Sequence, residues 1–331
     1  MRTKTITVLV VSAFVLPFYF LSAVVSAISF SKIQLPRNAS GPEALAFKVG
    51  TGQFFAGIGD GRILKYQGPT IGFVDFGFTA PNRSKSVCDG THVASTSLVC
   101  GRPLGMALHH QTNRLYVCDA FFGFGVLGPE GGLLTILSTA ADGEPYGLCD
   151  GVVVHQRTGN VYFTDASAVY NIRQFKIAIR DNDSTGRLLK YSAESEQVTV
   201  LFRNLSYPGG VAIDEEENFV LVSEFIANRT RKIWLQGLKP YKSDIVNTRP
   251  RPGNIKKTRS DDFWMAAGRT DSQTASKLMA IGEKINADGN VIETVDLEKW
   301  YGSKTVSEVQ MFDNKLYVAS PFVDFIGLYE Q

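Results

Sequence analysis

A short pattern of hydrophobic and polar positions recurs six times along the 331-residue chain. Each copy has a small or polar residue at its third position and then alternating apolar residues, and a second apolar segment follows shortly after. The copies begin at residues 42, 103, 149, 208, 252 and 306. Repeats of this length with several short strands are typical of a β-propeller. The pattern predicts one all-β, six-bladed propeller domain.

Three further segments refine this prediction. Residues 187–191 repeat the sequence of residues 62–66 closely, which supports repeated blades. Residues 170–180 place Ile172, Phe175 and Ile179 at helical spacing and predict a short helical insertion over one mouth of the channel. A propeller closes when both chain ends share a blade, so we expect residues 29–35 to pair with the last blade.

The first 27 residues are predicted to be a secretory signal peptide. Arg2 and Lys4 form a basic start, an apolar run covers residues 6–25, and small residues follow at 25–27. The run is also long enough for an uncleaved anchor. Pro17 and the small-residue site favour cleavage, so residues 28–331 are expected to form the mature propeller with no stable membrane association.

Sequons and cysteines agree with secretion. Five Asn-x-Ser/Thr sequons predict glycosylation, at Asn38, Asn82, Asn182, Asn204 and Asn228. Cys88 and Cys100 lie in a polar loop, where such a pair can close a 12-residue span in an oxidising compartment. Cys118 and Cys149 lie in apolar strand patterns, and we expect them to be buried free thiols.

Composition excludes some partners and leaves others open. The formal net charge is +2, charged residues make up 20% of the chain, and no basic stripe is present. A nucleic-acid partner is therefore not expected. The apolar fraction of 44% is ample for a large core.

Candidate chemistry lies where the repeats converge on the propeller axis. The second positions of the copies are Glu43, Leu104, Asp150, Gly209, Gly253 and Ser307, and the third positions are Ala44, Gly105, Gly151, Gly210, Asn254 and Glu308. One interpretation makes Glu43, Asp150 and Asn254 ligands of Ca²⁺. The other makes Glu308 a general base whose pKa is raised by burial. Alternatively, Glu308 is a structural carboxylate paired with Arg or Lys.

Several motifs resemble the plant strictosidine synthase family from residue 41 to residue 329. They include Gly-Arg-Ile-Leu-Lys-Tyr-Gln-Gly at 61–68, Val-Tyr-Phe-Thr-Asp at 161–165, Pro-Gly-Gly at 208–210 and Pro-Gly-Asn-Ile-Lys at 252–256. The family is a six-bladed propeller of the secretory pathway, usually vacuolar. Its namesake is an alkaloid-biosynthesis lyase that condenses tryptamine with the aldehyde secologanin by a Pictet–Spengler reaction. The resemblance implies a disulfide between Cys88 and Cys100 and makes Glu308 the catalytic base.

The same resemblance implies a substrate pocket with an altered wall. Its positions carry Leu104, Leu148, Asp150, Ala166, Tyr207, Phe225, Val306, Pro321 and Phe322. Several of these differ from the aromatic or His residues of the namesake, and the setting of Glu308 resembles the synthase-like members. The expected partners are a small amine and an aldehyde, without a cofactor or a metal.

Two other functions are compatible with the sequence. The ring also resembles calcium-dependent lactonases and paraoxonases more distantly, which would make the chain a hydrolase. A non-catalytic propeller that binds an apolar small molecule is the third hypothesis. For all three, the expected location is the vacuole or, alternatively, the extracellular space.

Overall fold

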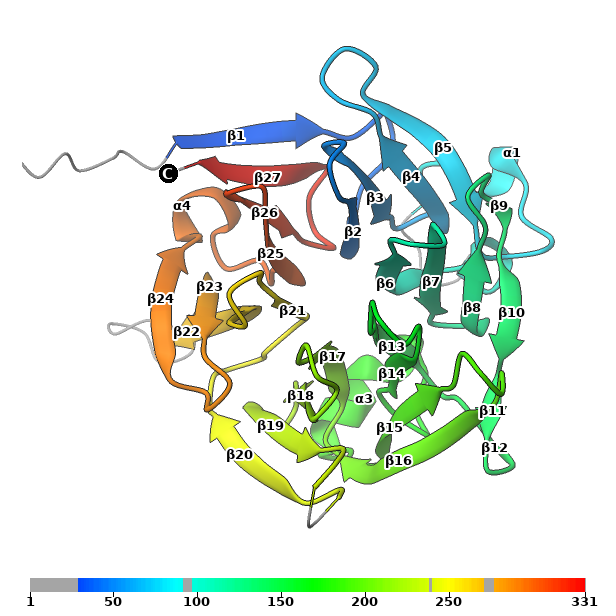
Figure 1. The fold of residues 1–331 in the computed structure, drawn as a ribbon. Coiled ribbons are helices and arrows are strands. Elements are labelled where there is room, and N and C mark those ends of the chain that lie inside the picture. Colours follow the sequence, from blue (N-terminus) through cyan, green and yellow to red (C-terminus); the bar gives the residue numbers. More distant parts are fainter. Residues whose placement is uncertain (1–28, 92–96, 238–239, 271–276, 331) are drawn as a thin grey trace, which may run out of the picture.

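Six sheets surround a central axis in the computed structural model of the chain, as the blades of a propeller do (Figure 1). They are antiparallel except for one added strand, which pairs in parallel with the outer strand of the first blade. The structure describes residues 29–91, 97–237, 240–270 and 277–330. The expected signal peptide therefore lies outside the described residues. The prediction of an all-β, six-bladed propeller is confirmed.

Each blade places its strands in chain order from the axis outward, except that the last blade ends on the first strand of the chain. Blade 1 consists of β2 (Ala44–Lys48), β3 (Gln53–Gly57), β4 (Arg62–Tyr66), β5 (Phe73–Phe78) and the added β9 (Gly132–Leu133). Blade 2 consists of β6 (Pro103–His109), β7 (Arg114–Asp119), β8 (Gly123–Leu127) and β10 (Thr135–Ser138). Blade 3 consists of β13 (Cys149–Val154), β14 (Val161–Asp165), β15 (Gly186–Tyr191) and β16 (Val198–Leu205). Blade 4 consists of β17 (Pro208–Ile213), β18 (Phe219–Glu224), β19 (Arg229–Trp234) and β20 (Ser243–Asn247). Blade 5 consists of β21 (Ile255–Lys257), β22 (Phe263–Thr270), β23 (Leu278–Ile285) and β24 (Val291–Asp296). Blade 6 consists of β25 (Glu308–Phe312), β26 (Lys315–Ala319), β27 (Phe325–Glu330) and β1 (Ser29–Gln34).

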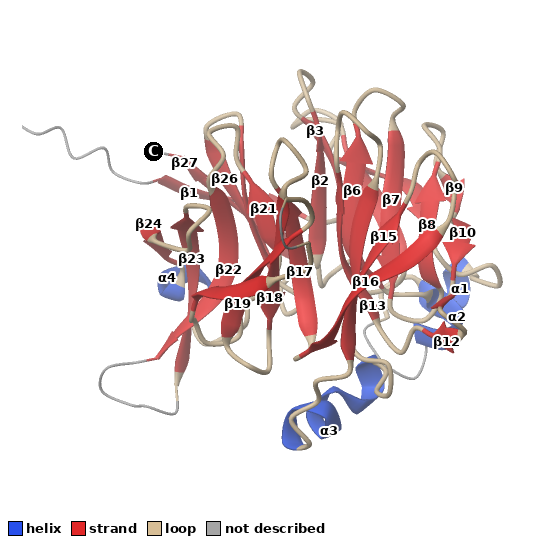
Figure 2. Ribbon diagram, turned by 60° about the horizontal axis from the view of Figure 1, so that its bottom comes forward, coloured by secondary structure: helices blue, strands red, loops and turns tan. Residues whose placement is uncertain are grey.

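The remaining elements are short. A two-stranded ribbon joins β11 (Ala140–Ala141) to β12 (Glu144–Pro145), and the helices are α1 (Lys85–Cys88), α2 (Ser97–Cys100), η1 (Ile172–Gln174), α3 (Phe175–Arg180) and α4 (Glu298–Tyr301). The predicted helical insertion is η1 with α3, which projects beyond one end of the propeller (Figure 2). Within the described ranges, no helix is long and apolar enough to cross a membrane.

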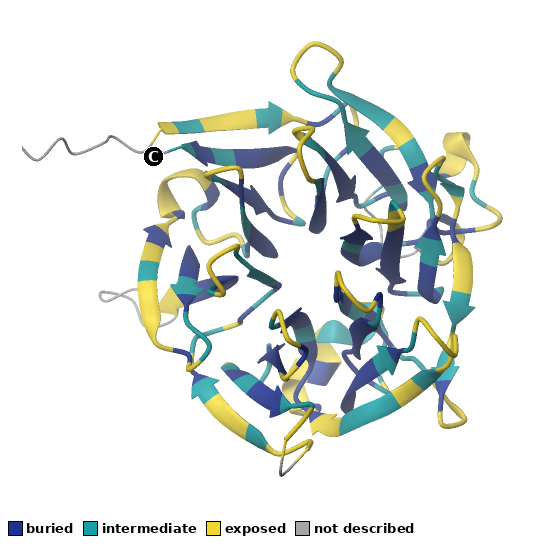
Figure 3. Cartoon of the chain, in the orientation of Figure 1, coloured by how far each residue is buried: buried dark blue, intermediate teal, exposed yellow. Residues whose placement is uncertain are grey.

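Burial falls from the inner strands to the outer ones (Figure 3). All six residues of β18 are buried, because neighbouring blades cover both faces of that strand. The outer strand β16 carries both exposed and partly buried residues. Hydrophobic contact between blades, distributed around the ring, therefore holds the propeller together.

The predicted ring closure is confirmed. β1 pairs antiparallel with β27, in a register that runs from Ser29 opposite Glu330 to Gln34 opposite Phe325. The first and last described strands thus share blade 6, which removes two free strand edges. The partly buried Phe30 packs against Tyr329 across this pair, with ring centroids 4.9 Å apart.

Three consecutive blades end their second strand on a buried carboxylate. Asp119 ends β7, Asp165 ends β14 and Glu224 ends β18. Each accepts a hydrogen bond from a backbone N–H that lies one or two residues before the inner strand of its own blade. Arg102 donates to Asp119 at 2.6 Å, Leu148 to Asp165 at 2.9 Å and Ser206 to Glu224 at 2.9 Å. These acids fix where each inner strand starts, and so they position the side chains around the axis.

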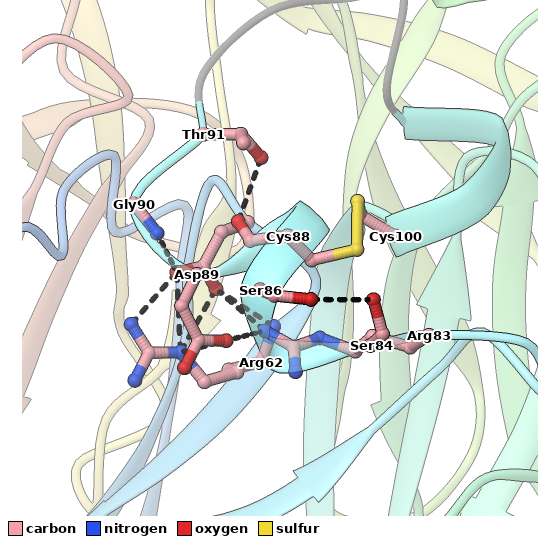
Figure 4. Close-up of a disulfide and its surroundings, with 10 residues drawn as sticks. Arg62, Arg83, Ser84, Ser86, Cys88, Asp89, Gly90, Thr91 and Cys100 are labelled. Carbon is pink, nitrogen blue, oxygen red and sulfur yellow. Dashed lines mark hydrogen bonds and ion pairs between the residues drawn. A yellow bond between two sulfur atoms is a disulfide. The ribbon is translucent and has the colours of Figure 1, made fainter.

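The Cys88–Cys100 disulfide implied by the family resemblance is present, with the two Cα atoms 5.4 Å apart (Figure 4). It joins the short helices α1 and α2. Beside it, Asp89 forms ion pairs with Arg62 and Arg83, and these contacts tie the loop to blade 1.

The expectation that Cys118 and Cys149 are free thiols is wrong. They form a second disulfide, with a Cα–Cα distance of 5.1 Å. Cys118 lies in β7 of blade 2, Cys149 begins β13 of blade 3, and β7 packs against β13. Contact between adjacent blades brings together two apolar strand positions that are 31 residues apart in the sequence.

Candidate active site

The inner strands begin at the end of the channel where α3 projects, which we call the α3 end. α3 lies in the connection from β14 to β15, and β13 runs antiparallel to β14, so β13 starts at this end. Gly105, Gly151 and Gly210 occupy three of the six third positions, because there the next blade is too close for a side chain. A Cβ on Gly105 would lie 2.0 Å from the carbonyl oxygen of Asp150, and one on Gly151 would lie 2.5 Å from that of Gly209. The polar side chains left at third positions are Asn254 and Glu308.

Glu308 is fully buried at the start of β25 and is held by three donors. Its Oε1 accepts a hydrogen bond from the backbone N–H of Leu45 at 3.0 Å. Its Oε2 accepts one from Nδ2 of Asn254 at 3.3 Å and lies 3.4 Å from Nζ of Lys256. The donors come from blades 1 and 5, so the position of the carboxylate depends on closure of the ring.

Burial raises the pKa of Glu308 to about 7. The positive charge of Lys256 and the N–H of Leu45 lower the pKa, and the nearby Glu43 raises it, but burial has the largest effect. A carboxyl group with a pKa near neutrality can take up and release protons at physiological pH, as a general base must.

Two further carboxyl groups, those of Glu43 and Asp150, lie at the same end. Glu43 forms an ion pair with Arg102 at 2.8 Å, whereas Asp150 has no hydrogen-bond or ion-pair partner within the residues that the structure describes. Burial raises the pKa of Asp150 well above its usual value; the charge of Glu43 adds to this effect and the charge of Arg102 opposes it. Asp150 is therefore a carboxyl group at the α3 end that is not bonded to another described side chain.

Five of the predicted pocket residues meet in one apolar cluster at the α3 end. They are Leu104, Leu148, Ala166, Tyr207 and Phe225. Phe175 of α3 packs against the rings of Tyr207 and Phe225, with each pair of ring centroids 5.4 Å apart. The helical insertion thus contributes apolar and aromatic side chains to this cluster.

The other predicted pocket residues lie elsewhere. Val306 is buried in the cluster between blades 5 and 6, together with Trp264 and Val309. Pro321 and Phe322 lie in the turn between β26 and β27, where Phe322 is 60% exposed. These three residues do not belong to the apolar cluster at the α3 end.

Two of the three residues of the calcium interpretation are engaged in other contacts. Glu43 pairs with Arg102, and Asn254 donates a hydrogen bond to Glu308. Across the described ranges, no group of three or more His, Cys, Asp or Glu side chains is placed to hold a metal ion. The donor set at the axis therefore fits a divalent cation poorly.

A cavity of about 820 Å³ occupies the opposite end of the channel, which we call the open end. Leu45, Met106 and Lys256 contribute to its lining, and its rim contains the turns that follow the inner strands. Leu45 and Lys256 both contact Glu308, whereas the carboxylate itself is fully buried. Glu308 therefore lies directly behind two residues of the cavity wall.

Comparison with known proteins identifies the family. A sequence model described as strictosidine synthase matches residues 150–238, which include Asp150, Tyr207 and Phe225. Strictosidine synthase of Catharanthus roseus is 32% identical over 300 residues, covering 90% of this chain and 85% of that protein. Strictosidine synthase-like protein 12 of Arabidopsis thaliana is 37% identical over 302 residues, covering 91% of this chain and 89% of that protein. The chain belongs to the strictosidine synthase family.

Solved structures share the propeller at much lower identity. A gluconolactonase from Xanthomonas campestris has a TM-score of 0.66 at 13% identity and covers 92% of this chain and 90% of its own. Regucalcin, a calcium-binding protein from Agrobacterium tumefaciens, has a TM-score of 0.61 at 12% identity, with 90% and 93% covered. These similarities show the fold alone.

Sequence analysis did not identify one contact of the candidate site, that of Lys256 with Glu308. Lys256 belongs to the Pro-Gly-Asn-Ile-Lys motif, two residues after Asn254, and it faces Glu308. The sequence allowed for an Arg or Lys partner of Glu308 without identifying it. Lys256 could have been recognised in the sequence as a charged residue on an inner strand, where most residues are apolar.

Proposed function

We propose that this member of the strictosidine synthase family condenses a small amine with an aldehyde by a Pictet–Spengler reaction, with Glu308 as general base. The observation that supports this most directly is the buried carboxyl group of Glu308, whose pKa is about 7. It lies on the ring of strand starts that also carries the apolar cluster, in a chain 32% identical to strictosidine synthase.

The chemistry needs a base twice. An ammonium group must lose a proton before its nitrogen attacks the aldehyde carbon. The resulting carbinolamine loses water to give an iminium ion, and the aromatic ring carbon then forms the new C–C bond and releases a proton. A carboxylate beside the reacting atoms can accept both protons, and the overall balance is amine plus aldehyde giving product and water.

The apolar cluster supplies what the iminium step requires. Leu104, Leu148 and Phe225 exclude water from the α3 end, and an iminium ion is destroyed by water. The aromatic rings of Tyr207 and Phe225 can pack on a flat amine such as tryptamine. Holding both substrates in one place replaces a bimolecular encounter with an intramolecular step.

The two alternative functions have less support. In the hydrolase, Glu43, Asp150 and Asn254 would hold calcium, but two of these three side chains are already bound to protein groups. A non-catalytic binding protein would not need a carboxylate of near-neutral pKa at the channel. Both alternatives predict that Glu308 is dispensable for any condensation.

We also propose passage through the secretory pathway to the vacuole, with the extracellular space as the alternative. All five sequon asparagines are exposed, including Asn204 and Asn228 next to or within strands. Two disulfides are characteristic of an oxidising compartment. These features support a glycoprotein of the secretory pathway, and the proposed condensation would make it a lyase of alkaloid biosynthesis.

The test is mass spectrometry of the purified protein after incubation with tryptamine and secologanin. We expect a product with the summed mass of the substrates minus water, formed with a single stereochemistry. Glu308→Gln should lower the rate by about 100- to 10,000-fold, the usual contribution of a general base, while circular dichroism shows an intact fold. Equal activity in that variant would contradict the mechanism.

If the native protein forms no product above the spontaneous background, the proposed substrate pair is wrong. A panel of other amines and aldehydes, followed by lactones with and without calcium, then separates a synthase of different specificity from the hydrolase. Glu216→Gln changes a carboxylate that is 65% exposed and serves as the matched control.

A further inference from the structure

Lys256 reaches across the channel. It lies on β21 of blade 5, and its Nζ donates a hydrogen bond to the backbone carbonyl of Met106 at 3.2 Å. Met106 lies on β6 of blade 2, which is opposite blade 5 in a six-bladed ring. The same Nζ lies 3.4 Å from Oε2 of Glu308 on blade 6. One side chain thus connects three blades at the axis.

No other cation within the described ranges lies at ion-pair distance from Glu308. The remaining donors to this carboxylate, the N–H of Leu45 and the amide of Asn254, are neutral. The other charged group that acts on Glu308 is Glu43, which is itself paired with Arg102. Without Lys256, a fully buried carboxylate would face only neutral donors and another carboxylate.

The adjacent Lys257 provides an internal comparison. Its Nζ pairs with Glu215 at 2.8 Å and with Asp261 at 2.7 Å, both of which are more than 60% exposed. Lys256 is 13% exposed and pairs with a carboxylate that has no exposure. The two lysines share sequence context and line the same cavity, but only Lys256 turns toward the axis.

We propose that Lys256 is a positioning residue for Glu308: it crosses the channel, fixes the carboxylate in place and supplies the positive charge that its ionised form requires. Because Lys256 lines the open-end cavity while Glu308 does not, its side chain also forms part of the partition between that cavity and the α3 end. This inference rests on the proposed function, in which Glu308 acts as the base.

The physical consequence is a defined pH dependence. An opposite charge within about 4 to 6 Å favours the ionised form of a carboxyl group. Removing Lys256 therefore makes ionisation of Glu308 harder, and the base becomes available only at higher pH. Replacing Lys256 with a residue that keeps the charge should restore the behaviour, which a merely structural role in packing would not predict.

The experiment compares Lys256→Met with Lys257→Met, using tryptamine and secologanin. We expect the acidic limb of the kcat/KM–pH profile to move to higher pH by about 1 to 2 units in Lys256→Met, the usual size of such a charge effect. Lys256→Arg should restore much of the original profile, and Lys257→Met should leave it unchanged. An unmoved acidic limb in Lys256→Met would overturn the proposal.

A readout without substrate separates this inference from the proposed function. Infrared difference spectra of the native protein minus Glu308→Gln report the titration of the Glu308 carboxyl group. Its midpoint should rise in the Lys256→Met background, even if the native protein forms no condensation product. Lys256→Gln, which keeps a donor for Met106, replaces Lys256→Met if the latter does not fold. A midpoint that stays the same in the neutral variant contradicts the role of Lys256.

Discussion

Two sets of buried carboxylates differ sharply in their partners. At the ends of second strands, Asp165 accepts hydrogen bonds from Arg187 and the N–H of Leu148, and Glu224 binds two arginines and the N–H of Ser206. At the channel, Glu308 has one lysine and two neutral donors, and Asp150 has no bonded partner in the described part of the chain.

The difference shows what each set contributes. Arginine pairing lowers the pKa of Glu224 even though burial acts in the opposite direction. At Glu308 the single lysine does not offset burial, and the pKa remains raised. Burial also raises the pKa values of Asp119 and Asp165, so the contrast between the two sets lies in their partners and not in the direction of the pKa shift. The strand-end acids have bonded partners that stabilise the blades, whereas Asp150 has none within the described residues. Function is therefore expected where pairing is incomplete.

Asp165→Asn gives the largest expected effect on stability. It removes the buried charge that compensates Arg187, which is 1% exposed, and leaves only the exposed Glu144 as its ion-pair partner. Breaking a buried ion pair in this way costs about 4 kcal/mol of unfolding free energy. Urea denaturation measures this loss, with Glu216→Gln as the exposed control. A loss no greater than in the control would mean that the strand-end acids do not hold the blades.

Glu308→Gln should change how stability depends on pH. The pKa of Glu308 rises from 4.5 in the unfolded chain to about 7 in the fold, so the folded state binds the proton more tightly. Stability from this group is present below pH 4.5 and falls as the pH rises to 7, by about 3 kcal/mol. Unfolding free energies of the native protein and the variant, measured across this range, should diverge by that amount. Parallel curves would show that Glu308 titrates normally.

Asp150→Leu should raise stability slightly, because it replaces a carboxyl group that burial penalises and that has no bonded partner within the described residues. A gain of about 1 kcal/mol is typical when a functional polar group is replaced in this way. The gain should grow as the pH rises, since the raised pKa means that ionising Asp150 destabilises the fold. Thermal unfolding at several pH values tests this, and a destabilised variant would show that Asp150 has a structural partner.

Much of the fold could be predicted from the chain itself. The six inner strands, their second strands, the helical insertion and closure through residues 29–35 all follow from local periodicity and repetition, and the structure contains each of them. The repeat also indicated that Glu308 differs from the other third positions. Local patterns carry this information because a strand or turn depends mainly on neighbours in sequence.

The sequence did not determine which side chains meet. Lys256 binds the carbonyl of a residue 150 positions away, and Leu45 donates to Glu308 across 263 positions. The Cys118–Cys149 disulfide likewise arises only when adjacent blades pack. Such contacts depend on the close approach of strands around the axis, which composition and periodicity do not encode. The sequence thus determined the blades and the ring positions, and the tertiary structure decided the charge environment of Glu308, because ring closure brings its partners from blades 1 and 5.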